Sequence, residues 1–148
     1  MKKTIMIMSM LLLGCSKEEV KPKKSVQYVI DPSVVEYVLD FQRDIESVGL
    51  ALENDNISFS IILGVLPNDV AGMAIGMFNP YCVNIILDEE IWRILNRSER
   101  KALVYHELAH DVFELHHNTC DIMSGGLREI TDDMIRELLE TLAKHQNK

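Results

Sequence analysis

The sequence lacks three features that would place it in common functional classes. It has no basic patch interleaved with aromatic residues, and 15 Lys and Arg stand against 23 Asp and Glu, a formal net charge of −8 at pH 7. Because nucleic-acid binding relies on clustered cations, this composition argues against nucleic acid as a partner. The N-terminal apolar run, Thr4 to Leu13, is too short to span a bilayer as a helix. No internal repeat is present, so a solenoid is not expected.

The N-terminus carries an export signal. Lys2 and Lys3 form a short basic region before the apolar run, and the stretch Leu12-Leu13-Gly14-Cys15 resembles a bacterial lipobox. The resemblance implies that residues 1–14 are a lipoprotein signal peptide and that Cys15 is acylated, which would anchor the chain to a membrane. An ordinary secretory signal, with Cys15 incidental, is the alternative. Residues 15–26 then form the lipidated cysteine and a flexible tether, and residues 27–148 form one domain.

The residues after Cys15 bear on where the anchored protein would reside in the cell envelope. Ser16 takes the place of an aspartate that would retain a lipoprotein in the inner membrane, which favours the outer membrane. Lys17-Glu18-Glu19 resembles the charged signal for surface export in some Gram-negative groups, although a solvated tether has the same composition. Surface exposure is therefore one of two options.

Only two cysteines remain after Cys15, and they are Cys82 and Cys120. In an oxidising compartment these two could pair as a disulfide, and two buried thiols are the alternative.

Four of the five histidines lie between His106 and His117, beginning with the run His106-Glu107-Leu108-Ala109-His110. On a helix, His106 and His110 are about 40° apart around the axis and about 6 Å apart along it, so both can bind one tetrahedral Zn²⁺ ion. Glu107 points roughly 100° away from His106, beside the metal. There its carboxylate can hold a zinc-bound water, take its proton and pass the proton to a leaving amine. This order of residues predicts metal-assisted peptide hydrolysis.

A third ligand cannot come from further along the same straight helix. A residue at position 117 of that helix would lie roughly 10 Å beyond His110, far more than a Zn–N bond of about 2 Å allows. The chain must therefore turn back between residues 110 and 116 if a later histidine completes the site.

These residues resemble the metzincin clan of zinc endopeptidases, whose pattern is H-E-x-x-H-x-x-G-x-x-H followed by a methionine-bearing turn. The resemblance covers about 18 residues. It implies that His106, His110 and His116 are zinc ligands, that Glu107 is the general base, and that Met123 in Asp121-Ile122-Met123-Ser124 forms an apolar floor beneath the metal. The implied function is a membrane-anchored zinc endopeptidase acting on peptide or protein substrates.

Phe113 departs from this pattern, because the family has glycine at that position to leave the helix with positive φ. A non-glycine residue pays roughly 1–2 kcal/mol for that conformation. Either Phe113 bears this strain, or the helix runs one or two residues longer and His117 becomes the third ligand. The spacing favours His116.

Two other functions fit the same residues. In a zinc peptidase of the glutamate-ligand type, Glu129 would supply the third ligand, 19 residues after His110. A surface lipoprotein that binds a metal or a partner without catalysis is the alternative from another class.

The expected fold is α+β, a minimal zincin-like domain with a small mixed sheet, an active-site helix and a C-terminal helix. We expect a helix from about Pro32 to Ser47, strands over Ile57–Val65, Gly72–Met77 and Tyr81–Leu87, and a short helix from Asp88 to Asn96. A long helix capped by Ser98 should carry the histidines, and a last helix capped by Thr131 should reach about Lys144.

Two further roles are open. Gly72–Met77 is a candidate for an edge strand on which a peptide substrate could pair as an additional strand, although an ordinary hairpin strand of the core is the more probable interpretation. Asp111 is expected to be an exposed helix residue, with support of a ligating imidazole as the alternative.

Overall fold

A computed structural model describes residues 28–52, 58–77, 79 and 82–146. The predicted signal peptide, Cys15 and the tether lie outside these residues. The elements in chain order are β1 (Tyr28–Ile30), α1 (Val35–Glu46), β2 (Ser58–Gly64), β3 (Gly72–Ala74), β4 (Cys82–Asp88), α2 (Glu89–Ile94), α3 (Arg97–Phe113) and α4 (Asp132–Gln146).

The described strands form one four-stranded sheet in the order β1-β2-β4-β3. β1 and β2 are parallel, β2 and β4 are parallel, and β3 runs antiparallel to β4. The predicted hairpin-like pair is thus confirmed, and its first strand, β3, is an edge of the sheet. The sequence did not predict β1, whose three residues are largely exposed.

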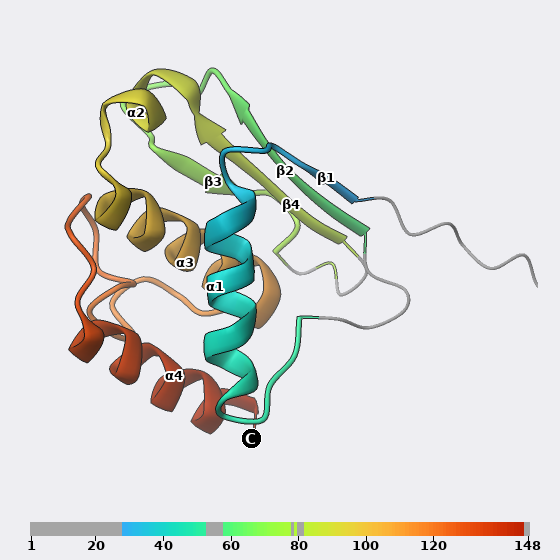
Figure 1. Cartoon of the computed structure of the whole chain (residues 1–148), viewed down its shortest axis with the longest axis vertical. Helices are drawn as coiled ribbons and strands as arrows, with labels where there is room; N and C mark the ends of the chain where they lie inside the picture. Colours follow the sequence, from blue (N-terminus) through green and yellow to red (C-terminus); the bar gives the residue numbers. More distant parts are fainter. Residues whose placement is uncertain (1–27, 53–57, 78, 80–81, 147–148) are drawn as a thin grey trace, which may run out of the picture.

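The helices gather on one side of the sheet, where α1 and α3 lie side by side and α4 lies against α3 (Figure 1). Alternate strand residues face these helices and are buried: Phe59, Ile61, Val83, Ile85 and Leu87. This period of two is what a sheet with one covered face requires. The α+β class and the small mixed sheet are therefore confirmed.

The N-cap of the long helix α3 lies two residues before the predicted cap, Ser98. Asn96 is its N-cap and exchanges hydrogen bonds with Glu99 in a capping box. Ser98 instead bonds both to the backbone N–H and to the carbonyl of Ile130, with distances of 3.0 and 3.2 Å. Ser98 thus fixes the segment that leads into α4.

Of the two alternatives for the cysteines, the structure has the free thiols: Cys82 is half-buried, Cys120 is buried, and the possible disulfide between them is not formed. Cys82 alternates along β4 with Val83, which faces the helices, so its side chain belongs to the opposite face of the sheet. Cys120 is buried in the core on the helical side. The sheet therefore separates the two sulfurs.

Within the described residues, no helix combines the length and apolar character needed to cross a membrane.

Candidate metal centre

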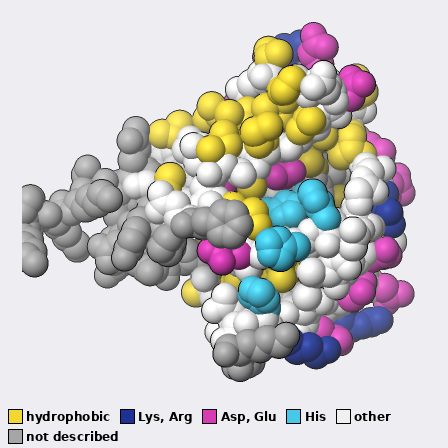
Figure 2. All heavy atoms as spheres, turned by 180° about the vertical axis from the view of Figure 1, so that it is seen from behind, with side chains coloured by type: hydrophobic (Ala, Val, Ile, Leu, Met, Phe, Trp, Pro, Cys, Tyr) yellow, Lys and Arg dark blue, Asp and Glu magenta, His cyan; other side chains and the backbone are white. Residues whose placement is uncertain are grey.

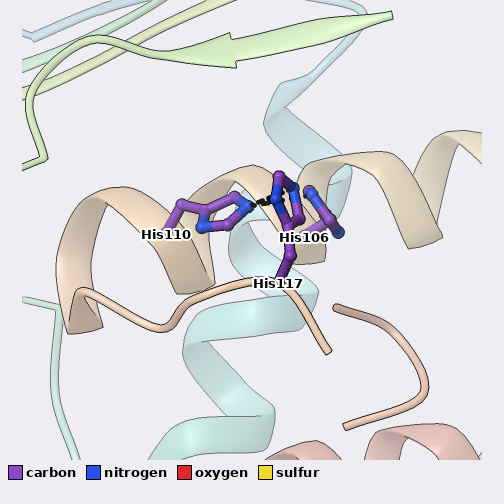
Figure 3. Close-up of side chains that lie close together, drawn as sticks. All are labelled: His106, His110 and His117. Carbon is purple, nitrogen blue, oxygen red and sulfur yellow. Dashed lines mark hydrogen bonds between the residues drawn. The ribbon is translucent and has the colours of Figure 1, made fainter. Parts of the chain in front are cut away.

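Three imidazole rings converge at the end of α3 (Figure 3). His106 and His110 project from the helix, and His117 comes from the chain that follows it. The Nε2 atom of His110 is 3.0 Å from that of His106 and 3.0 Å from that of His117. Among the described residues, these three form the group able to hold a metal ion.

The third member of the group is His117, not His116, which the spacing favoured. The reason is where α3 ends. Phe113 stays helical and buried, and Glu114 takes the left-handed conformation with φ of 54°. The chain thus leaves the helix one residue later than in the metzincin pattern, and the third candidate ligand shifts from position 116 to position 117. His116 is exposed and lies outside the group.

Backbone carbonyls set the orientation of the two helical imidazoles. His106 Nδ1 lies 2.8 Å from the Ile122 carbonyl oxygen, and His110 Nδ1 contacts the Leu115 carbonyl oxygen. Because a carbonyl only accepts hydrogen bonds, each Nδ1 carries the proton and donates it. In the neutral ring, Nε2 then presents its lone pair toward the centre of the group.

The protonation state of the His106 and His110 rings is the one that metal binding requires. Burial lowers the pKa of His106. Burial, followed by the neighbouring His106, lowers the pKa of His110 to about 4. Both rings are therefore neutral at pH 7, which is the form that binds a metal.

This donor set fits zinc. Two nitrogens of a tetrahedral site with Zn–N bonds of about 2.05 Å lie about 3.3 Å apart, close to the 3.0 Å separations of this group. Three lone pairs directed at one point repel one another unless a cation lies between them. Each Nδ1–H of the helical pair already has a carbonyl partner, as metal-bound histidines usually do. Three protein ligands leave a fourth position of the tetrahedron open.

Glu107 lies beside this group, is 5% exposed, and packs against the edge strand. A Cβ atom at Gly72 would lie 2.5 Å from Glu107 Oε1, so glycine permits the carboxylate to reach β3. Burial, then the charge of Asp111, raises the pKa of Glu107 to about 7, and a hydrogen bond from the Ala74 backbone opposes this shift. A carboxyl group with such a pKa can both accept and release a proton at neutral pH.

The four side chains line one cleft of about 590 Å³. Its walls are β3, the histidine-bearing face of α3, and residues 124–128 of the following loop. Histidine side chains gather at the middle of the face shown in Figure 2, below a broad area of hydrophobic side chains. The cleft therefore brings an edge strand, the buried Glu107 carboxylate and a group able to bind a metal together.

The loop after α3 carries the predicted methionine turn. Met123 is fully buried, and its backbone N–H bonds to the Cys120 carbonyl at 3.0 Å. The preceding residue, Ile122, supplies the carbonyl that orients His106. The turn thus reaches the metal group through its backbone. The role of Met123 as an apolar floor remains a prediction.

Glu129 does not join the group. Its carboxylate accepts a hydrogen bond of 3.1 Å from the Asn96 side chain at the other end of α3. The glutamate-ligand alternative therefore lacks its third ligand in this structure.

Sequence reasoning missed the position of Asp111, which is buried and not exposed. Its carboxylate bonds to the sheet, at the backbone N–H groups of Gly76 and Asn84. The signal available in the sequence was the spacing of Glu107 and Asp111, which places both carboxylates on one helical face.

Comparison with protein families, with curated proteins and with solved structures gave no match to this chain.

Proposed function

We propose that this protein is a zinc-dependent endopeptidase of metzincin-like type, with His106, His110 and His117 as ligands and Glu107 as general base. One observation carries the proposal: the convergent Nε2 atoms and the buried Glu107 carboxylate line the same cleft. A site that only stored zinc would have no use for a buried base beside an open coordination position.

Each part of the cleft has a chemical task in this proposal. His106, His110 and His117 would hold the zinc, which when bound would act as a Lewis acid toward a peptide carbonyl and would lower the pKa of a bound water to about 7. Glu107 accepts a proton from the attacking water and delivers it to the departing amine. The edge strand β3 offers backbone groups on which an extended peptide can pair as a further strand.

The test replaces Glu107 with glutamine, which keeps the size of the side chain and removes the base. Purified Glu107→Gln protein should retain one zinc per chain by metal analysis and should cleave fluorescein-labelled casein roughly 100-fold more slowly than the wild type. Glu140→Gln, at an exposed position on α4, is the matched control and should leave cleavage unchanged. Equal cleavage by Glu107→Gln and wild type would refute the mechanism.

A non-catalytic zinc-binding lipoprotein is the second candidate, and the same experiment separates it. In that case the wild type would bind zinc through the three histidines and would cleave no peptide, and Glu107→Gln would change neither property.

The lipobox residues support a further part of the proposal, a lipid anchor on Cys15 at the outer membrane. This part rests on the N-terminal sequence, which lies outside the described residues.

A further inference from the structure

Asp111 follows the ligand His110 on α3, yet it bonds to the sheet. Its Oδ2 atom accepts hydrogen bonds from the backbone N–H groups of Gly76 at 3.1 Å and Asn84 at 3.0 Å. Asn84 belongs to β4, and Gly76 lies just beyond β3 in the connection between the two strands. One carboxylate thus ties β4 and the β3–β4 connection to the helix that carries the histidines.

Glycine makes this contact sterically allowed. A Cβ atom at Gly76 would lie 2.4 Å from Asp111 Oδ1 and 2.2 Å from the Cys82 carbonyl oxygen. Gly72, four residues earlier, gives the same close approach to Glu107. Two carboxylates on successive turns of α3 therefore contact the hairpin at two glycines, one at the start of β3 and one just after it.

The burial of Asp111 costs more free energy than a residue that only joins a helix to a hairpin would be expected to cost. Asp111 is 5% exposed, and its Oδ1 atom has no hydrogen-bond partner in the described part of the chain. A buried carboxylate oxygen without a partner costs free energy, and such costs concentrate at functional sites.

We propose that Asp111 is a positioning residue: it clamps the β3–β4 hairpin onto α3 and so fixes the edge strand, and Glu107 packed on it, relative to the three histidines. The catalytic consequence rests on the proposed peptidase function. The clamp itself is a property of the fold and can be measured without activity.

The clamp is tested by amide hydrogen exchange of the metal-free protein. Asp111→Ala removes the acceptor of the Asn84 N–H, so exchange at Asn84 should rise at least 10-fold. The Gly76 N–H also bonds to the Asn84 carbonyl at 3.3 Å, so a smaller rise is expected there. Asp133→Ala, at a carboxylate that is 82% exposed and pairs with Arg136, is the matched control and should leave both amides unchanged. Unchanged exchange in Asp111→Ala would overturn the clamp.

The positioning role is tested with zinc bound and fluorescein-labelled casein as substrate. Asp111→Ala should retain one zinc per chain and lose at least 10-fold in kcat/KM. Asp111→Asn keeps an oxygen that accepts the same N–H groups, so it should restore exchange protection and most of kcat/KM. Three results would each overturn positioning: wild-type kcat/KM in Asp111→Ala, loss of zinc in that variant, or an Asn variant no better than Ala.

Two further outcomes are distinguishable. If Asp111→Ala does not fold, Asp111→Ser, a smaller polar side chain at the same position, takes its place, and it should lower kcat/KM at least 10-fold with zinc retained; wild-type kcat/KM would then refute positioning. A wild type that binds zinc but cleaves no casein refutes the proposed peptidase, whereas the exchange data still confirm or refute the clamp.

Discussion

Replacing Glu114 with glycine should stabilise the protein, although Glu114 is not the glycine position of the metzincin pattern. Glu114 is the exposed C-cap of α3 and holds φ at 54°, a conformation that glycine adopts freely. Phe113, which occupies the family's glycine position, is helical and 5% exposed. The two residues therefore predict opposite responses to the same substitution.

The magnitudes follow from the two environments. At Glu114, glycine removes about 1–2 kcal/mol of strain from the left-handed conformation. It also costs about 0.4–1 kcal/mol, because glycine gives the unfolded chain more conformational entropy, so the net gain in stability is roughly 0.5–1 kcal/mol. At Phe113, glycine removes a buried aromatic ring that lies 6.3 Å from the ring of Phe41. Losing that ring costs about 3–5 kcal/mol, and glycine inside a helix adds about 1 kcal/mol.

Urea unfolding of the metal-free domain measures both free energies. Glu114→Gly should raise the midpoint and raise Tm by about 2–4 °C, and Phe113→Gly should lower the free energy of unfolding by roughly 4 kcal/mol or more. A more stable Phe113→Gly protein, with Glu114→Gly destabilised, would show that the chain reverses at Phe113 and would return the third ligand to His116.

Three other predictions concern the ligand, the core and the anchor. His117→Ala should lose most of the bound zinc and His116→Ala almost none, as measured by metal analysis after dialysis; the reverse order would refute the assignment. Tyr105→Phe removes a buried hydroxyl that donates to Asp44 at 2.6 Å, so it should lower the free energy of unfolding by about 1.5–3 kcal/mol in urea, and a change below 0.5 kcal/mol would contradict this role. Cys15→Ser should abolish labelling by radioactive palmitate and release the protein from the membrane fraction; continued labelling would exclude the lipobox.

The helical part of the metal site could be predicted from sequence because its geometry is local. His106, Glu107 and His110 lie within five residues of one helix, and the period of 3.6 residues fixes their relative directions. The identity of the third ligand depended on a single residue at the helix end. Tertiary packing decides where the helix ends, because the burial of Phe113 in the core keeps Phe113 helical.

Other features escaped sequence reasoning because their partners are distant. Asp111 bonds to backbone groups 35 and 27 residues earlier in the chain, and backbone groups leave no pattern in a sequence. β1 is three residues long and owes its existence to its pairing with β2. The start of α1 was placed early because Asp31 and Pro32 resemble a helix start, whereas the helix begins at Val35 after a turn.

The carbonyls of Leu115 and Ile122 have a consequence beyond orienting imidazoles. Both belong to the segment between α3 and α4, which contains no helix or strand and also carries His117. The segment therefore meets the metal group at three points, one through a ring nitrogen and two through its backbone. Any ion held there acts as a cross-link between this segment and α3.

Thermodynamic linkage then joins metal supply to the folding of this region. An ion that binds only the folded protein adds about 2.7 kcal/mol of stability when its free concentration is 100 times its dissociation constant. A chelator withdraws that contribution, and the segment from Glu114 to Thr131 would be the first to open to added trypsin, at Arg128 within it. The cleft wall at residues 124–128 would open with it, so scarcity of metal would remove the proposed substrate site together with the ion.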